Sequence, residues 1–285
     1  THQGVAIEAA LRGDDVALST GTASGKTICF SVPVFHELLT NPDATAIFLY
    51  PTKALAGDQI AKLLEMAEAT GCHGLVYRFD GDTSAKERQQ ALRYGRLLIG
   101  TPDVLHSTLL RRNKEKEYAE FFRRLKTVVL DECHVYRGAF GSNLAMVLRR
   151  LTQVCRNKGA TFRFLAASAT SKDPASHLRL LTGREFTVVN EAANGSPSGG
   201  RRFIMLNSGD DNSKDELINE YGLMAELARS GKRFITFCHS RRLTESVFQD
   251  LTEQFPDLIG QVMPYRSGYE PEDRRQIEQA LRQGS

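Results

Sequence analysis

DDVALSTGTASGKT (Asp14–Thr27) joins an apolar run to a glycine-containing loop and then to a helical pattern that begins at Ile28. A short apolar run is typical of a buried strand, so the stretch predicts a strand, a loop and a helix in that order. Gly21 and Gly25 let the backbone turn sharply, so that successive N–H groups and the helix N-terminus can converge on a phosphate. We therefore interpret the loop as a nucleotide phosphate-binding site.

The loop follows the pattern G-x-x-x-x-G-K-[S/T] incompletely, because Thr20 stands at the first glycine position and Ala23 lies inside the loop. Lys26 would reach the β- and γ-phosphates, and the Thr27 hydroxyl would bind Mg²⁺. The alternative is a glycine-containing turn that only caps a helix. The residues expected to bind the nucleotide here are Thr22, Ala23, Ser24, Gly25, Lys26 and Thr27.

A second string, VVLDECH (Val128–His134), supplies the chemistry that such a loop lacks. Its apolar residues predict a buried strand, and two carboxylates follow at the carboxyl end, where α/β sheets place their ligands. Asp131 is expected to hold Mg²⁺ through water, and Glu132 to orient and deprotonate the attacking water. The alternative is an ordinary acidic cap. We exclude a nucleophile–base pair of Cys133 and His134, because consecutive strand residues point to opposite faces.

A third string, TFRFLAASAT (Thr161–Thr170), predicts another apolar strand, which ends in Ser168-Ala169-Thr170. Small hydroxyl groups at a strand end can connect the Glu132 region with a neighbouring domain. By itself the tripeptide is weak evidence, since Ser and Thr commonly cap helices. Its position after the loop and the acidic pair gives it weight.

Composition limits the class of protein. The chain has 285 residues, enough for one large domain or two of ordinary size. It is 41% hydrophobic and contains no apolar run long enough to span a bilayer, so we expect neither a membrane span nor a membrane partner. The net charge of +3 is too small to indicate nucleic acid by itself. Five scattered cysteines without a C-x-x-C pair argue against a zinc site and favour reduced thiols in a cytoplasmic protein.

Strand-like runs alternate with amphipathic helical stretches over residues 1–190, which predicts an α/β domain with a parallel sheet. Residues 191–200 contain Gly and Pro and have no apolar period, so we interpret them as a linker. A second α/β pattern fills 201–285, with strands expected at 202–207, 233–238 and 258–264, and helices at 215–230, 241–254 and 271–283. The first-domain strands are expected near 15–20, 45–51, 74–79, 96–101, 127–132, 161–168 and 186–190.

Polar strings follow three other expected strands, at Tyr50–Lys53, Phe79–Thr83 and Gly100–Asp103. Each places a backbone N–H group, a hydroxyl or a lysine at a helix start, where it can contact the phosphates of a nucleic-acid backbone. Taken singly, each string is more typical of a helix cap. Their recurrence in one sheet beside a nucleotide site favours a function.

The order of these strings resembles the superfamily-two helicases with a DExH box, and within them the MrfA-type bacterial mitomycin-repair helicases and their fungal Hrq relatives. The DExH and Ser-Ala-Thr strings place the superfamily. The branch is indicated by Ala23, by YRGAFGS (Tyr136–Ser142) and by YRSGYEPEDRR (Tyr265–Arg275). The resemblance runs almost end to end and includes HQGVAIEAAL (His2–Leu11), YPTKALAGDQ (Tyr50–Gln59), GTPDVLH (Gly100–His106) and TFCHSRRLTE (Thr236–Glu245).

The resemblance implies two RecA-like parallel-sheet domains, the second incomplete in this chain. It implies that Gln3 reads the adenine edge and selects ATP over GTP, since an amide can pair with adenine N6 and N7. The implied catalytic residues are Lys26, Asp131 and Glu132. The residues implied to couple hydrolysis to domain motion are His134, Ser168 and Thr170. The residues implied to contact a tracked strand are Thr52, Lys53, Gly81, Thr101, Pro102, His239, Ser240, Arg241 and Arg266.

The implied function is an ATP-dependent and Mg²⁺-dependent helicase or translocase that moves along single-stranded DNA in DNA repair, at the nucleoid if the source is bacterial. An RNA helicase or remodeller stays open, because backbone contacts discriminate weakly unless a 2′-OH is read. A catalytically idle scaffold is the third possibility, against which the intact Lys26, Asp131 and Glu132 argue. Relatives continue past Leu281 with arginine fingers and a cysteine-rich metal-binding region. We therefore expect these residues alone to hydrolyse ATP weakly.

Overall fold

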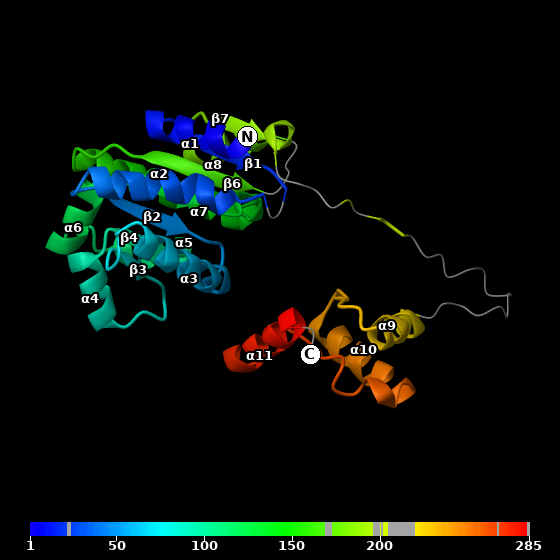
Figure 1. The fold of residues 1–285 in the computed structure, drawn as a ribbon. Coiled ribbons are helices and arrows are strands. Elements are labelled where there is room, and N and C mark those ends of the chain that lie inside the picture. Colours follow the sequence, from blue (N-terminus) through cyan, green and yellow to red (C-terminus); the bar gives the residue numbers. More distant parts are fainter. Residues whose placement is uncertain are drawn as a thin grey trace. The chain divides into compact units, whose positions relative to one another are not determined.

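The computed structural model divides the chain into two units, Thr1–Gly199 and Gly200–Ser285 (Figure 1). It describes residues 1–21, 24–168, 173–195, 200, 202–204, 220–266 and 268–283. None of the helices in these ranges is long and apolar enough to cross a membrane.

The strands described in the first unit all pair in parallel and form a seven-stranded sheet in the order β3-β4-β2-β5-β6-β1-β7. Each begins and ends within two residues of a predicted strand, so the predicted parallel α/β sheet is confirmed. The bounds are β1 (Val16–Ser19), β2 (Thr45–Leu49), β3 (Val76–Arg78), β4 (Leu97–Gly100), β5 (Leu125–Leu130), β6 (Arg163–Ser168) and β7 (Thr187–Asn190).

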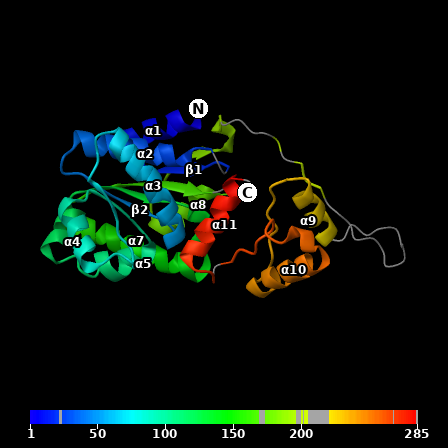
Figure 2. The same cartoon turned by 60° about the horizontal axis from the view of Figure 1, so that its bottom comes forward.

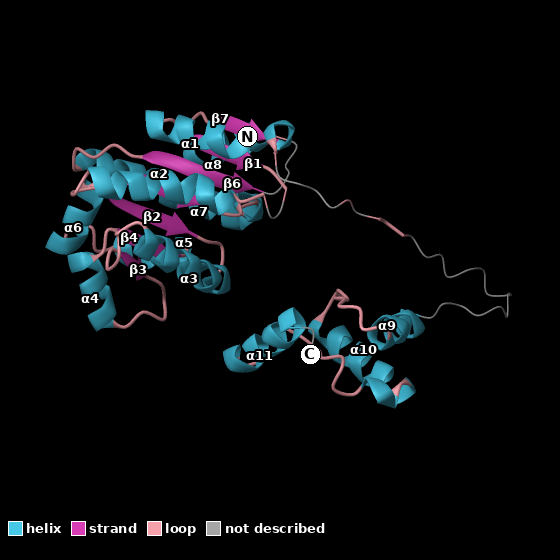
Figure 3. Ribbon diagram, in the orientation of Figure 1, coloured by secondary structure: helices cyan, strands magenta, loops and turns pink. Residues whose placement is uncertain are grey.

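Helices cover both faces of this sheet (Figures 2 and 3). In β5, Val128 and Leu130 join the core on one face and Val129 joins the core on the other, because strand side chains alternate. Burial on both faces explains why the strands read as unbroken apolar runs. One face is covered by α1 (His2–Arg12), α2 (Lys26–Thr40) and α3 (Lys53–Ala69), and the other by α4 (Ala85–Tyr94), α5 (Pro102–Val104), α6 (Lys116–Arg123), α7 (Gly138–Asn157) and α8 (Pro174–Thr182).

The start of α7 explains one glycine of the YRGAFGS string. A side chain at Gly141 would press its Cβ into the backbone oxygen of Tyr136, at a distance that no residue with a Cβ tolerates. Tyr136 itself is buried and its ring packs against Phe140 at 5.4 Å. The string therefore folds the chain tightly back after the acidic pair.

The strand order sorts the chain's motifs into two neighbouring groups. β5, β6 and β1 are adjacent, and Ser168 lies in register with Ser19. β3, β4 and β2 are adjacent on the other side, and Leu49 of β2 lies in register with Leu130 of β5. Because all these strands are parallel, the loops that follow them emerge at one carboxyl edge of the sheet.

The second unit agrees with the prediction in its helices and differs from it in its strands. Its described residues form α9 (Glu220–Arg229), α10 (Arg241–Gln254) and α11 (Pro271–Gln283), with a small core around Leu251 and Leu258. The strands expected at 233–238 and 258–264 are not formed, apart from one bridge between Ile259 and Val262. A strand forms only where a neighbouring strand accepts and donates its backbone hydrogen bonds. Among the described residues, no neighbouring strand pairs with residues 233–238. The strand expected at 202–207 lies largely outside those residues.

Candidate nucleotide and nucleic-acid site

The phosphate loop runs from the end of β1 to the start of α2, as predicted. Gly25 caps α2 with a φ of 73°, the left-handed region that favours glycine. A Cβ at this position would lie 2.5 Å from Nε2 of Gln3. The backbone conformation thus favours glycine at position 25, and a side chain there would make Gln3 move. Thr22 and Ala23 lie outside the described residues.

Lys26 connects the loop to the neighbouring strand β6. Its ammonium group donates hydrogen bonds to the backbone oxygens of Thr20 at 3.0 Å, Gly21 at 3.4 Å and Ser168 at 3.3 Å. The hydroxyl of Ser24 closes the loop through Thr20 Oγ1 at 2.7 Å. The lysine charge is therefore held by carbonyl oxygens at the place where a phosphate is expected.

The start of α1 lies against this loop. Nε2 of Gln3 is 3.5 Å from the Gly25 oxygen, a long hydrogen bond that a nucleotide base could replace. His2, which the sequence analysis did not identify, is buried, and its Nε2 lies 2.8 Å from the Ser24 oxygen. The Gly195 N–H group donates to its Nδ1, so Nε2 carries the proton and donates to Ser24.

A second unpredicted contact comes from Glu191, inside the segment interpreted as a linker. Its carboxylate accepts a hydrogen bond from the Gly21 N–H group at 2.7 Å and another from Asn194 Nδ2 at 2.8 Å. These two bonds hold the pKa of Glu191 below its usual value. The segment after β7 thus contacts the phosphate loop directly.

The acidic pair follows β5, where Asp131 donates its N–H to the Leu49 oxygen of β2 at 3.0 Å. The Asp131 carboxylate accepts the N–H of Glu132 at 2.9 Å. Glu132 has a φ of 49° and is the only non-glycine residue with a positive φ in the described part of the chain. Such a conformation costs about 1–3 kcal/mol and is typical of functional sites. His134 Nδ1 lies 3.1 Å from the Glu132 carboxylate.

Burial raises the pKa of Asp131 to about 6, and the adjacent Glu132 carboxylate adds to this rise. The Glu132 N–H group and the charge of Lys26 oppose it. Within the described ranges no three His, Cys, Asp or Glu side chains gather into a metal site. Mg²⁺ binds through one or two protein oxygens together with water and phosphate oxygens. Asp131 and the Thr27 hydroxyl supply such oxygens.

The sequence analysis excluded a pair of Cys133 and His134 because it placed both residues on the strand, and this placement is wrong. Both lie in a 3-10 helix (Cys133–Val135) after the strand, not on the strand itself. The Cys133 thiol is buried and donates to the Leu130 oxygen at 3.1 Å, and burial raises its pKa. His134 faces Glu132 instead.

Ser168 ends β6 beside the loop. Its hydroxyl is buried and finds no hydrogen-bond partner among the residues that the structure describes. A buried hydroxyl without a hydrogen-bond partner is costly, because burial removes the water that would otherwise bind it. Thr170 lies outside the described ranges.

Lys53 and Gly81 meet in the first unit although they are distant in sequence. Thr52 caps α3 by accepting the Leu55 N–H group, and Lys53 is the first residue of that helix. A Cβ on Gly81 would lie 3.0 Å from Nζ of Lys53. Thr101 and Pro102, at the end of β4 between them, have buried side chains, so a strand could reach them only through the backbone.

Three of the four strand-contact residues predicted in the second unit lie at the start of α10, and the fourth, Arg266, pairs with a residue of that helix. Ser240 caps this helix by accepting the Leu243 N–H group at 3.1 Å. Its neighbours in the sequence, His239 and Arg241, are both exposed. Arg266 reaches the same helix through an ion pair with Glu245 at 2.5 Å, which raises its pKa.

Residues 1–178 match the family model described as DEAD/DEAH box helicase. The chain belongs to this family. It is 36% identical over 293 residues to the Bacillus subtilis protein described as uncharacterized ATP-dependent helicase YprA, a match that covers 100% of this chain and 38% of that protein. It is also 36% identical to the ATP-dependent helicase hrq1 of Schizosaccharomyces pombe, over 99% of this chain and 28% of the relative.

Among solved structures, helicase MrfA bound to DNA and AMPPNP matches 100% of this chain and 40% of that one, with a TM-score of 0.88 and 35% identity. The resemblance to MrfA-type and Hrq-type helicases is therefore confirmed. The chain spans well under half the length of each of these three relatives.

Proposed function

We propose that this chain carries the nucleotide-hydrolysing part of an ATP-dependent helicase or translocase that moves along single-stranded DNA. The supporting observation is the division of one sheet edge into two halves. The expected nucleotide groups follow β1, β5 and β6, and the expected strand-contact groups follow β2, β3 and β4. β2 and β5 pair along their length, so the two halves lie next to each other in the sheet.

Each nucleotide-side residue has a chemical role in this proposal. Lys26 leaves its carbonyl oxygens and binds the phosphates, while Gln3 exchanges the Gly25 oxygen for the adenine edge. Glu132 orients the attacking water and accepts its proton, and His134 holds that carboxylate. Asp131 and Thr27 would hold Mg²⁺, which neutralises charge on the phosphates.

We assign residues 1–190 to a first RecA-like domain, 191–200 to a linker and 201–285 to the first part of a second such domain. The division of the chain at Gly199–Gly200 supports this assignment, as does the gathering of Ser240, Arg241 and Arg266 around α10. Closure of two such domains on ATP is the motion that would convert hydrolysis into stepping. Ser168 and Thr170 would connect the closing domains to the acidic pair.

DNA is the proposed substrate because the MrfA structure is described as bound to DNA. DNA repair is proposed from the resemblance to the MrfA and Hrq branch alone. The groups on the first unit are a lysine, hydroxyls and backbone groups, which are suited to phosphates rather than bases, so binding should depend little on sequence and strongly on salt.

The test of the strand half is the variant Lys53→Ala, with Lys62→Ala as the control. Lys62 lies on the same helix, is exposed and carries the same charge. We expect Lys53→Ala to weaken binding of unrelated single-stranded DNA sequences equally, and to reduce the slope of log K against log salt by about 0.7. Lys62→Ala should change neither quantity by a comparable amount. A sequence-selective loss, or equal effects of the two variants, would contradict the backbone contact.

A further inference from the structure

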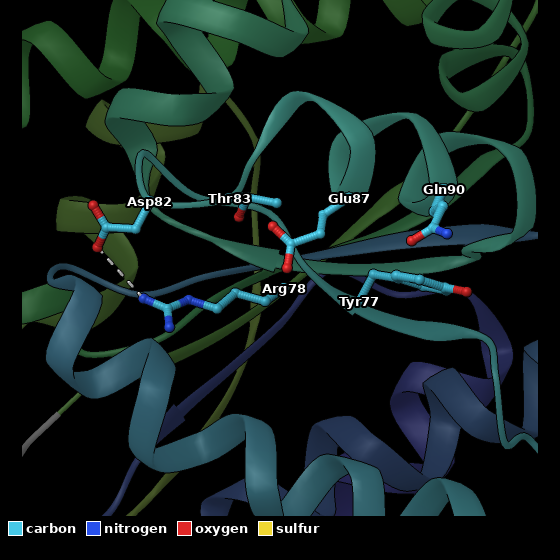
Figure 4. Close-up of a pocket in the computed structure, with 6 residues that line it drawn as sticks. All are labelled: Tyr77, Arg78, Asp82, Thr83, Glu87 and Gln90. Carbon is cyan, nitrogen blue, oxygen red and sulfur yellow. Dashed lines mark ion pairs between the residues drawn. The ribbon is translucent and has the colours of Figure 1, made fainter.

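Lys53 does not have a free ammonium group in the absence of nucleic acid. Its Nζ pairs with Oδ1 of Asp82 at 2.5 Å. Arg78 approaches the other oxygen of the same carboxylate at 3.7 Å, and Figure 4 shows this second ion pair. Asp82 follows Gly81 in the turn after β3, and Lys53 begins α3 after β2. A carboxylate of the chain thus pairs with the lysine that the proposed function assigns to a phosphate.

The turn does not depend on the Asp82 carboxylate. Asp80, which is fully buried, holds the turn by accepting the Asp82 N–H group at 2.9 Å and by pairing with Arg78 at 2.5 Å. The Thr83 hydroxyl accepts the Asp80 N–H group at 2.9 Å. The side chain of Asp82 is 62% exposed and can leave Lys53 while the backbone of the turn stays in place.

Asp82 also has space to move. With Arg78, Thr83, Glu87 and other polar residues it lines an open cavity of about 340 Å³ between β3 and α4 (Figure 4). The Lys53 side chain is 49% exposed, so the pair is in contact with solvent. Exposed ion pairs are weak and are screened by salt, so an incoming anion can replace one of the partners.

We propose that Asp82 is an internal competitor of the nucleic-acid backbone, which neutralises Lys53 in the free protein and is displaced by a phosphate when a strand binds. This inference rests on the proposed function of Lys53. Exchange of one anion for another gains little energy at each contact, so the strand is held more weakly than by a free lysine. Weak individual contacts let a protein release one phosphate and take the next, as movement along a strand requires.

The test is Asp82→Asn, which removes the competing charge and keeps the size of the side chain. The matched control is Asp58→Asn, which makes the same charge change at an exposed position on the helix of Lys53. Affinity for single-stranded DNA is measured at several salt concentrations, in the wild-type and Lys53→Ala backgrounds. We expect Asp82→Asn to tighten binding about two- to fivefold at low salt. The gain should shrink as salt rises and vanish in the Lys53→Ala background.

Five results would overturn the inference, and the last of them would also overturn the proposed function. Equal tightening by Asp58→Asn would show a general charge effect, and tightening that persists without Lys53 would separate Asp82 from that lysine. Weaker binding by Asp82→Asn would show that the carboxylate supports the strand contact. If the wild type binds single-stranded DNA and Asp82→Asn leaves its affinity unchanged, the role of Asp82 is wrong and the proposed function stands. If the wild type does not bind it, both are wrong.

Discussion

Gly25→Ala tests whether the phosphate loop is shaped for a ligand or only for the helix that it caps. Gly25 has a φ of 73°, and the left-handed conformation costs a residue with a Cβ about 1–2 kcal/mol. The new methyl group would also lie 2.5 Å from Nε2 of Gln3, which must rotate away. Because Gln3 is a flexible side chain, this second cost is small for stability. It should nevertheless remove Gln3 from the adenine position.

Gly71→Ala is the matched control. Gly71 has a φ of 76° and follows α3, and a methyl group at this position would meet no other side chain or backbone atom within 4 Å. Gly71→Ala should therefore lower the free energy of unfolding by the same 1–2 kcal/mol, to within about a factor of two, and leave the phosphate loop unchanged. Urea unfolding measures this loss in both variants, and equilibrium titration measures their affinities for ATP and GTP.

The backbone strain of Gly25→Ala must appear in one of two quantities. If the loop keeps its shape, the free energy of unfolding falls by about 1–2 kcal/mol. If the loop relaxes, ATP binding weakens by the same energy, about five- to thirtyfold. In both cases preference for ATP over GTP should fall in this variant and persist in Gly71→Ala. An unchanged stability together with unchanged nucleotide affinity would refute the reasoning.

Two further predictions concern the acidic pair and the end of β6. Because the pKa of Asp131 rises from 3.8 to about 6 on folding, the folded chain binds a proton more tightly than the unfolded chain between these values, and stability falls as pH rises through them. Without metal, Asp131→Asn should therefore exceed the wild type in unfolding free energy at about pH 7.5, by up to about 3 kcal/mol, and by less at about pH 4.5. Equal stabilities in urea at the higher pH would contradict the burial of a charged Asp131. Ser168→Ala should leave stability unchanged or raise it by up to about 1 kcal/mol, since it removes an unsatisfied hydroxyl, and should lower DNA-stimulated ATP turnover. A clear loss of stability would show that the hydroxyl has a partner in the free protein.

The sheet of the first unit could be predicted because burial on both faces produces continuous apolar runs. LKTVVL of β5 and RFLAAS of β6 carry that signal without help from distant residues. In the second unit the same apolar signal did not predict the strands correctly. Residues 233–238 are as apolar as a strand, yet Phe237 is 91% exposed and the segment forms no strand. A strand also needs a paired neighbour, which apolar sequence alone does not reveal.

The motifs of the nucleotide site could be located from spacing, but their contacts could not. The left-handed backbone of Glu132 gave no signal, since glycine and asparagine are the usual residues there. Glu191 read as part of a polar linker, and its bond to Gly21 joins residues that are 170 positions apart. The pair of Lys53 and Asp82 depends on β4 lying between β2 and β3, which the strand order shows and the sequence does not.

The central claim is that nucleotide and strand act on one sheet edge, and strand-dependent ATP turnover tests it most directly. Steady-state hydrolysis by the full-length protein is measured alone, with single-stranded DNA and with RNA of the same sequence, and Glu132→Gln serves as the inactive control. We predict stimulation by DNA above RNA, with turnover abolished and ATP binding retained in Glu132→Gln. Greater stimulation by RNA would replace the proposed substrate. ATP turnover that neither nucleic acid stimulates, or that Glu132→Gln retains, would contradict the account.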